Sequence, residues 1–273
     1  MQELKRQRQL PNMEKLGLLT ATILLTYAIG QFLTFPRQEV TLQLPGLYLV
    51  FQFNTPTIIT LIVAGMTASG AVWLFRDHPG LGRRNTMEHW LLPALVALVI
   101  GLPLFQTKLQ PLWWIGFFLG SALLILVLVA EYIVIDPEDT RQPLAVASLT
   151  IVAYALFLVL AIVLRYSGYR LFLLLPFLTL GGGLVCLRYF RLRFPNKNSI
   201  IPAGVITLVL SQITAALHYW PISPVSFSLA LLGPAYCLSC LIGNILEDQP
   251  AQRAVVEPLF LLVIIWGTAI IMA

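Results

Sequence analysis

Residues 110–134 read QPLWWIGFFLGSALLILVLVAEYIV, and this stretch decides the class of fold. Glu131 is its one charged residue, and it lies near the end of the stretch. An α-helix needs about 20 apolar residues to cross a hydrocarbon layer of about 30 Å. The stretch therefore predicts a transmembrane helix that begins near Pro111.

The rest of the chain has the same apolar character. Hydrophobic residues make up 58% of the 273 residues and charged residues 11%, and the mean hydropathy is +0.85. Soluble domains contain roughly 25% charged residues, so the composition excludes that class. We predict an all-α fold, a polytopic transmembrane helical bundle with about nine spans. The predicted spans are residues 16–35, 55–75, 88–105, 110–134, 143–165, 169–189, 199–218, 222–245 and 254–272.

Lys and Arg residues fall unevenly on the two sides of the predicted spans. With the N-terminus in the cytoplasm, 13 of the 17 lie in cytoplasmic segments and four in extracytoplasmic segments. Cytoplasmic loops of membrane proteins carry an excess of Lys and Arg. We therefore expect a multi-pass protein of a bacterial plasma membrane with a cytoplasmic N-terminus and an extracytoplasmic C-terminus. The same asymmetry explains the isoelectric point near 9.3 without a nucleic-acid partner.

The N-terminal part divides into a cytoplasmic tail at 1–15, the first span at 16–35 and an extracytoplasmic loop at 36–54. Within the loop, residues 39–53 read EVTLQLPGLYLVFQF, and apolar residues alternate with others on both sides of Pro45-Gly46. Alternation with a period of two around a turn dipeptide predicts a short β-hairpin. An extended segment leading into the next span would give the same pattern.

Two segments of the chain resemble each other at nearly constant spacing. ASGAVWL at 68–74 aligns with GGGLVCL at 181–187, an offset of 113, and PALVALV at 93–99 aligns with PAGVITL at 202–208, an offset of 109. We predict two four-helix repeats, residues 55–165 and 166–273, preceded by one span, a 1+4+4 arrangement. Each repeat has an even number of spans and starts on the same side, so the repeats would be parallel.

Two interrupted helices lie at matching positions of these repeats. Gly233-Pro234 falls near the centre of the span 222–245, and a proline removes one backbone hydrogen bond from a helix. Gly120-Ser121 takes the corresponding position in 110–134. Interruptions in corresponding spans of two repeats point to a substrate site near the middle of the membrane. The alternative is that these small residues simply let helices pack closely.

Glu131 and Asn244 also correspond, at an offset of 113, toward the cytoplasmic ends of their spans. An acidic residue within a membrane helix is a functional candidate by default. The predicted ligand-binding residues are therefore Gly120, Ser121, Glu131, Gly233, Pro234 and Asn244.

The histidines and cysteines predict neither a metal site nor a cofactor site. His89 and His218 fall near opposite faces of the membrane. We expect His89, beside Glu88, to be solvated at the interface, and His218, beside Tyr219-Trp220, to be interfacial as well. Cys237 and Cys240 share one helix face, where small polarisable side chains serve helix contacts.

A second hypothesis is a membrane-embedded lipid or isoprenoid enzyme. Residues 136–141 read DPEDTR, and Asp136, Glu138 and Asp139 could hold Mg²⁺ at the cytoplasmic face while the basic loops bind a diphosphate. The chain carries none of the acidic signatures of such enzymes, and an acidic loop that balances basic neighbours explains the run equally well.

The sequence thus favours an integral membrane protein without catalytic activity, which binds or moves a small or lipidic compound between two helical repeats. Its expected partners are membrane lipid and a small hydrophobic ligand. The alternatives are the lipid or isoprenoid enzyme and a structural subunit that packs against a membrane-protein partner.

Overall fold

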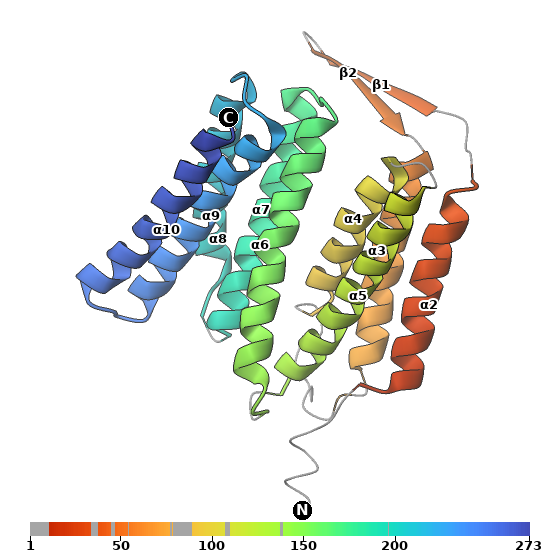
Figure 1. Ribbon diagram of the computed structural model, residues 1–273, viewed down its shortest axis with the longest axis horizontal. Coiled ribbons are helices and arrows are strands. Elements are labelled where there is room, and N and C mark those ends of the chain that lie inside the picture. Colours follow the sequence, from red (N-terminus) through yellow and green to blue (C-terminus); the bar gives the residue numbers. More distant parts are fainter. Residues whose placement is uncertain are drawn as a thin grey trace, which may run out of the picture. The chain divides into compact units, whose positions relative to one another are not determined.

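The computed structural model describes residues 11–33, 38–44, 47–53, 55–76, 78, 89–106, 110–136, 139–195 and 197–273, to which all structural statements refer (Figure 1). Within these residues the chain forms nine helices and one two-stranded sheet. The helices are α2 (Met13–Gly30), α3 (Thr55–Phe75), α4 (Leu91–Gln106), α5 (Pro111–Val134), α6 (Gln142–Tyr166), α7 (Leu171–Arg193), α8 (Ile200–His218), α9 (Pro224–Leu246) and α10 (Ala251–Ile271).

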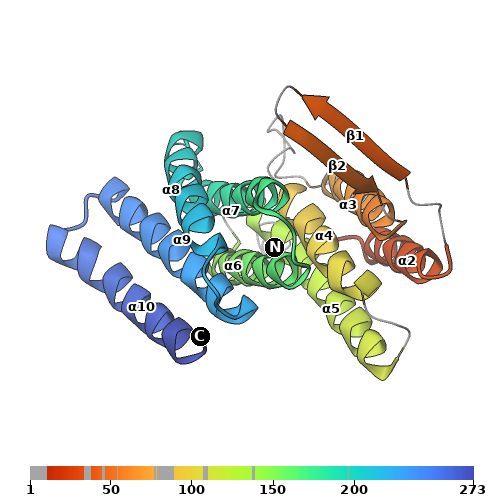
Figure 2. The same ribbon diagram turned by 90° about the horizontal axis from the view of Figure 1, so that it is seen from above.

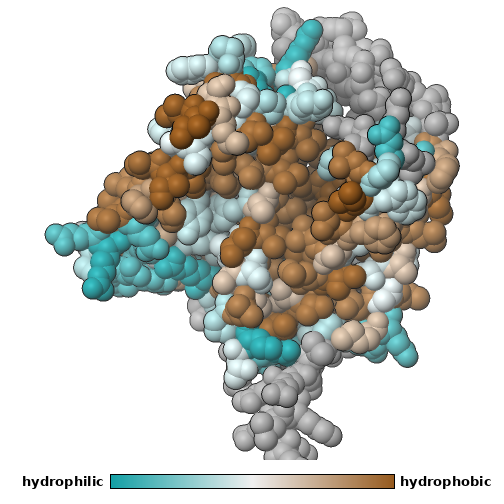
Figure 3. All heavy atoms as spheres, in the orientation of Figure 1, coloured by the Kyte–Doolittle hydropathy of each residue, from teal (hydrophilic) through white to brown (hydrophobic). Residues whose placement is uncertain are grey.

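Eight of the described helices are long and apolar enough to cross a membrane, and α4 is a shorter apolar helix. Large apolar side chains cover the outer surfaces of the helices, while hydrophilic atoms gather at helix ends (Figure 3). Apolar surface of this extent is stable next to lipid and not next to water. The prediction of a polytopic helical bundle is confirmed, and the chain is a multi-pass membrane protein.

The helix boundaries differ from the predicted spans in both halves of the chain. Helix α2 begins at Met13 because the side chain of Asn12 accepts a hydrogen bond from the Glu14 N–H (2.9 Å), which caps the first turn. Helix α7 continues to Arg193, four residues beyond the predicted span, so its last basic residues are helical. The basic residues that ended the predicted span therefore indicate where a helix leaves the membrane, while the helix itself can continue beyond them.

The predicted β-hairpin is confirmed by its two strands. Strand β1 (Gln38–Leu44) pairs antiparallel with β2 (Leu47–Phe53), so that Gln38 lies opposite Phe53 and Leu44 opposite Leu47. The turn dipeptide Pro45-Gly46 lies outside the described residues. The register brings the alternating apolar positions of the two strands opposite one another, and the chain is therefore not an extended lead-in to α3.

The chain divides into two compact units, residues 1–142 and 143–273. In the first unit α3 packs against α2 and α4, and α4 packs against α5; in the second α7 packs against α8, and α9 against α8 and α10 (Figures 1 and 2). The unit boundary lies at the start of α6, between residues 142 and 143, whereas the predicted repeat boundary lies at the end of the same helix, between 165 and 166. Consecutive helices pack side by side in most bundles, whether or not the chain contains a duplication. The packing therefore does not test the duplication, and the 1+4+4 arrangement stays a prediction.

Helix α9 ends in a complete left-handed cap. The Gln249 N–H donates to the Asn244 carbonyl (3.2 Å) and the Asp248 N–H to the Ile245 carbonyl (3.1 Å), the two bonds of a Schellman motif. Asp248 has φ +54°, a conformation in which glycine is the usual residue. This cap reverses the chain and starts α10 close to the end of α9.

We expect Asp248→Gly to raise the free energy of unfolding by about 0.5–1 kcal/mol, because glycine adopts this conformation without a Cβ clash. Asp248→Val should lower it by about 1–2 kcal/mol, since a branched side chain is strained there. Asp248→Asn is the control and should change little. Unfolding of the purified protein in detergent, followed by circular dichroism, measures all three. Equal effects of Gly and Val would contradict the assignment.

Candidate functional site

A polar pocket lies in the second unit where α9 ends. Its volume is about 280 Å³, close to the lower limit of about 300 Å³ for small-molecule sites. Helices α6, α7, α9 and α10 and the α9–α10 connection supply its wall. The lining residues are Val146, Thr150, Tyr189, Arg193, Tyr236, Cys240, Asn244, Gln249 and Glu257. In the space-filling view, hydrophilic atoms gather where α9 gives way to α10 (Figure 3).

Arg193, the last residue of α7, is held by α9 and its cap. Its Nε and Nη2 donate to the two carboxylate oxygens of Glu247, at 2.6 and 2.7 Å, a bidentate pair. Its Nη2 also donates to Oδ1 of Asn244 (3.1 Å) and its Nη1 to the Tyr189 hydroxyl (2.5 Å). The guanidinium is thereby fixed in orientation and its charge is balanced.

Hydrogen bonds from Arg193 lower the pKa of Glu247. Lys197 also donates to the carbonyl of Leu246 (2.7 Å), a carbonyl that the end of α9 leaves without a helical partner. The cations Arg193 and Lys197 thus lie at the negative end of the α9 dipole, where positive charge is favourable.

Asn244 connects three parts of the pocket. Its side chain is almost fully buried, and its Nδ2 donates to the Ala254 carbonyl of α10 (3.3 Å) and to Sγ of Cys240 (3.8 Å). Its Oδ1 accepts from Arg193. The residue that the sequence selected as a ligand contact is therefore at the pocket, and its amide supports the pocket wall.

Three tyrosines meet beside the pocket. The ring of Tyr154 on α6 lies 6.1 Å from that of Tyr189 and 5.3 Å from that of Tyr236, both in edge-to-face geometry. Tyr154 is buried, and its hydroxyl has no hydrogen-bond partner among the described residues. Tyr236 is half-buried and lines the pocket.

Glu257 lies in the second turn of α10 and is exposed at the pocket. It forms no ion pair with any residue in the described ranges. It is the one charged residue of the predicted span 254–272. Sequence reasoning missed it, although the rule that selected Glu131, an acid within a membrane helix, applies equally here.

A protein-family model described as "Protein of unknown function (DUF5656)" matches residues 35–272. The chain belongs to the DUF5656 family. No curated protein and no solved structure matches the chain. The DUF5656 region contains the hairpin, helices α3 to α10 and the whole polar pocket, whereas α2 precedes it.

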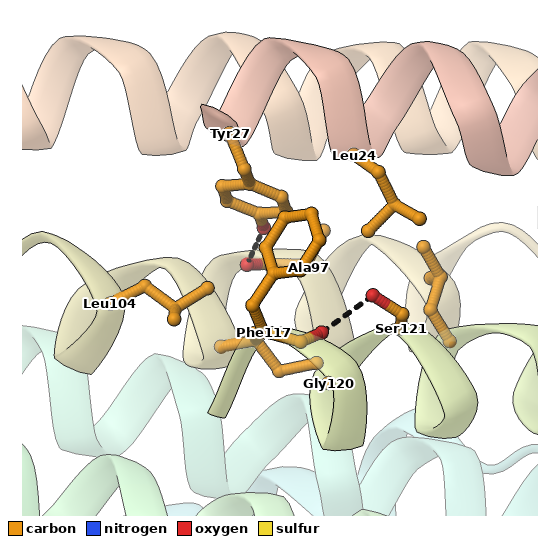
Figure 4. A pocket seen from close by; sticks show the side chains of 9 residues that line it. Leu24, Tyr27, Ala97, Leu104, Phe117, Gly120 and Ser121 are labelled. Atoms are coloured by element: carbon orange, nitrogen blue, oxygen red, sulfur yellow. Dashed lines mark hydrogen bonds between the residues drawn. The ribbon is translucent and has the colours of Figure 1, made fainter. Parts of the chain in front are cut away.

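Gly120 and Ser121 line a second cavity of the DUF5656 chain, in the first unit between α2, α4 and α5 (Figure 4). The Tyr27 hydroxyl donates to the Ala97 carbonyl, and Ser121 Oγ donates to Phe117 O (2.5 Å). The cavity measures about 10 Å³, which is room for one water molecule at most. A Cβ on Gly120 would lie 2.6 Å from Ile100, so the glycine lets α4 and α5 pack closely.

Gly233 and Pro234 have a packing role as well. A Cβ on Gly233 would lie 3.0 Å from side-chain atoms of Leu262 and Trp266 on α10. Pro234 has no N–H, so the carbonyl of Ala230 one turn earlier loses its helical donor. Trp266 Nε1 donates to that carbonyl instead (3.3 Å). The interruption in α9 is therefore filled by an indole from α10.

Glu131, the last predicted site residue, belongs to the first unit. It is fully buried near the end of α5, and its Oε2 lies 3.0 Å from Nδ1 of His89. The expectation that His89 is solvated is wrong, because its side chain is only 16% exposed. Glu88 lies outside the described residues. The structure thus groups the six predicted residues into Gly120 with Ser121, Gly233 with Pro234, Glu131 with His89, and Asn244 with Arg193.

The acidic run 136–141 contains an ion pair between Asp139 and Arg141. Nε and Nη2 of Arg141 donate to the two carboxylate oxygens of Asp139, at 3.1 and 2.8 Å, and its backbone N–H donates to Oδ1 (2.8 Å). These bonds lower the pKa of Asp139. Glu138 lies outside the described residues. Because Asp139 already accepts three hydrogen bonds from Arg141, the geometry favours the balanced acidic loop over a magnesium site.

We expect the Pro234→Ala background to weaken the effect of Trp266→Phe. In the native chain Trp266→Phe leaves the Ala230 carbonyl without a donor and should lower the free energy of unfolding by about 1–2 kcal/mol. In the Pro234→Ala background this carbonyl regains a helical donor, and the loss should fall by about 1 kcal/mol. A double-mutant cycle on thermal unfolding measures the coupling, and strictly additive effects would contradict the indole hydrogen bond.

The Asp139–Arg141 pair makes stability depend on pH. The folded-state pKa of Asp139 is lowered, so its stabilisation is complete above the ordinary pKa of 3.8 and is lost as the pH falls below it. We expect Asp139→Asn to lower the melting temperature at pH 6 and to have progressively less effect below pH ~4. Glu14→Gln, at an exposed N-terminal position, is the control; a pH-independent effect of Asp139→Asn would contradict the pairing.

Proposed function

We propose that this protein binds a small or lipidic compound in the polar pocket at the end of α9 and performs no catalysis on it. One observation carries the proposal: a pocket of about 280 Å³ with charged and amide side chains in its wall, among helices long and apolar enough to cross a membrane. The cavity at Gly120 is too small for such a compound. A few converging polar groups in a concave site are what small-molecule recognition requires.

The rigidity of the pocket wall supports binding. Asn244 and Tyr189 are buried, where polar groups need hydrogen bonds, and they form one connected network with Arg193 and Glu247. A preformed wall lowers the free energy that ordering would otherwise take from binding. Cys240 is the nucleophilic side chain of the lining, and no histidine, the usual base that activates a thiol, is among the described residues that line the pocket.

The test is native mass spectrometry of protein released gently from its membrane, with the retained compounds identified. Thr150→Trp fills the pocket from α6, and Ile151→Trp, on the exposed face of the same helix, is the matched control. We expect one compound at a fixed ratio in the native protein and in Ile151→Trp, and its loss in Thr150→Trp.

Equal retention by all three proteins, or bulk phospholipid alone, would overturn the proposal. A membrane protein retained at a fixed ratio, together with bulk phospholipid, would favour the structural-subunit alternative. Circular dichroism and size-exclusion profiles establish that both Trp variants fold.

A further inference from the structure

We propose that the ligand of the polar pocket carries a positively charged ammonium group, bound by the Glu257 carboxylate and the ring of Tyr236. The inference rests on the proposed function and names its ligand class. Its basis is the set of charges that the pocket offers to a ligand.

The positive charge of the pocket is already used within the protein. Arg193 is paired with both carboxylate oxygens of Glu247 and also donates to Asn244. An anionic ligand would have to compete with Glu247 for the guanidinium, whose Nε and Nη2 are both engaged in the bidentate pair. Lys197 is directed at the Leu246 carbonyl. Both cations are therefore engaged within the protein, and an anionic ligand would gain little binding free energy from them.

The acidic side chain that lines the pocket has no cationic partner among the described residues. Glu257 lines the cavity and forms no ion pair within the described part of the chain. Arg253 precedes it by one helical turn on α10 but is exposed and forms no ion pair with it. A carboxylate beside apolar helices is unfavourable without a counter-charge, and one that is retained usually binds a cation or a proton.

Tyr236 supplies the second element of a cation site. Aromatic rings attract cations placed over their faces, most strongly where water is excluded. The ring of Tyr189 already has the Arg193 guanidinium 5.9 Å from its centroid. No described Lys or Arg lies over the ring of Tyr236, which lines the same cavity as Glu257.

The lining of the pocket favours an organic cation over a metal ion. Calcium and magnesium take several oxygen ligands from carboxylates, carbonyls and water, whereas no group of three metal-binding side chains occurs in the described residues. The side chains of Val146 and Cys240 give the wall an apolar part. A substituted ammonium with a small apolar body satisfies the carboxylate, the ring and the apolar wall together.

Cys240 reports on the pocket directly, because it lines the cavity. With Cys186→Ser and Cys237→Ser it becomes the sole thiol of the chain. The probes are two methanethiosulfonates of similar size, one with a trimethylammonioethyl group and one with a sulfonatoethyl group. The measurement is the ratio of their modification rates at Cys240 in the folded, full-length protein, divided by the same ratio for a free thiol.

We expect the cationic reagent to be favoured by about tenfold or more, because the free charge near Cys240 is negative. Glu257→Gln should remove most of this preference, and Glu14→Gln, an exposed acid of the first unit, should leave it unchanged. Tyr236→Phe should keep the preference and Tyr236→Leu should reduce it. Tetraethylammonium should slow the modification in a saturable way in the parent protein and not in Glu257→Gln.

Equal rates for the two reagents, or a preference that Glu257→Gln leaves intact, would overturn the ammonium inference while the pocket itself stood. A preference without saturable protection would overturn it as well, because the site would then attract cations without binding them. If neither reagent modified the folded protein while both modified the unfolded chain, the pocket would be closed and the proposed function would fail with the inference.

Discussion

A backbone carbonyl or N–H that faces lipid has no water to bond with, so a chain in a membrane must provide each such group with a partner of its own. Within a helix the backbone groups bond to one another. In the second unit, side chains provide the missing hydrogen bonds at a proline and at a helix end. At Pro234 the carbonyl of Ala230 takes its hydrogen bond from Trp266, and at the end of α9 the carbonyl of Leu246 takes one from Lys197. Polar side chains from α10 and from the α7–α8 connection thus lie where the helical hydrogen bonding of α9 is broken or ends.

The polar pocket follows from the same requirement. Asn244 bonds a carbonyl of α10, and Arg193 bonds Asn244 and the residue that caps α9. Each of these side chains has a structural reason to be polar. Glu257 does not, since it bonds no backbone group and no cation in the described residues. A carboxylate that lies in a membrane helix, lines a pocket and has no structural partner is a candidate for binding a ligand.

The elements that depend on local pattern were predictable from the sequence. The predicted span 55–75 has the bounds of α3, and the alternation around Pro45-Gly46 gave the two paired strands. Pairings between distant residues were not predictable, because they depend on how helices pack. His89 meets Glu131 across 42 residues and Arg193 meets Glu247 across 54.

The residues of the candidate site also divide into those that the sequence pattern could predict and those that depend on how the helices pack. Gly120 and Gly233 mark places where another helix comes close, and Ile100 and Trp266 occupy the space that a ligand would need. Small residues in a span give the same sequence signal whether a neighbouring side chain or a ligand fills the space beside them. Asn244 was found because its offset from Glu131 was regular, and Arg193 was missed because its charge suggested a loop.

Helices α9 and α10 are joined at both ends and in the middle. Ser223 Oγ donates to the Met272 carbonyl (3.1 Å), Trp266 bonds Ala230, and Asn244 bonds Ala254. Tyr236 and Glu257 therefore sit on one stiff hairpin with a fixed spacing, and Arg193 secures α7 to it. A ligand held by Tyr236 and Glu257 would therefore meet two groups whose spacing the fold has already set, so that binding would not have to order them.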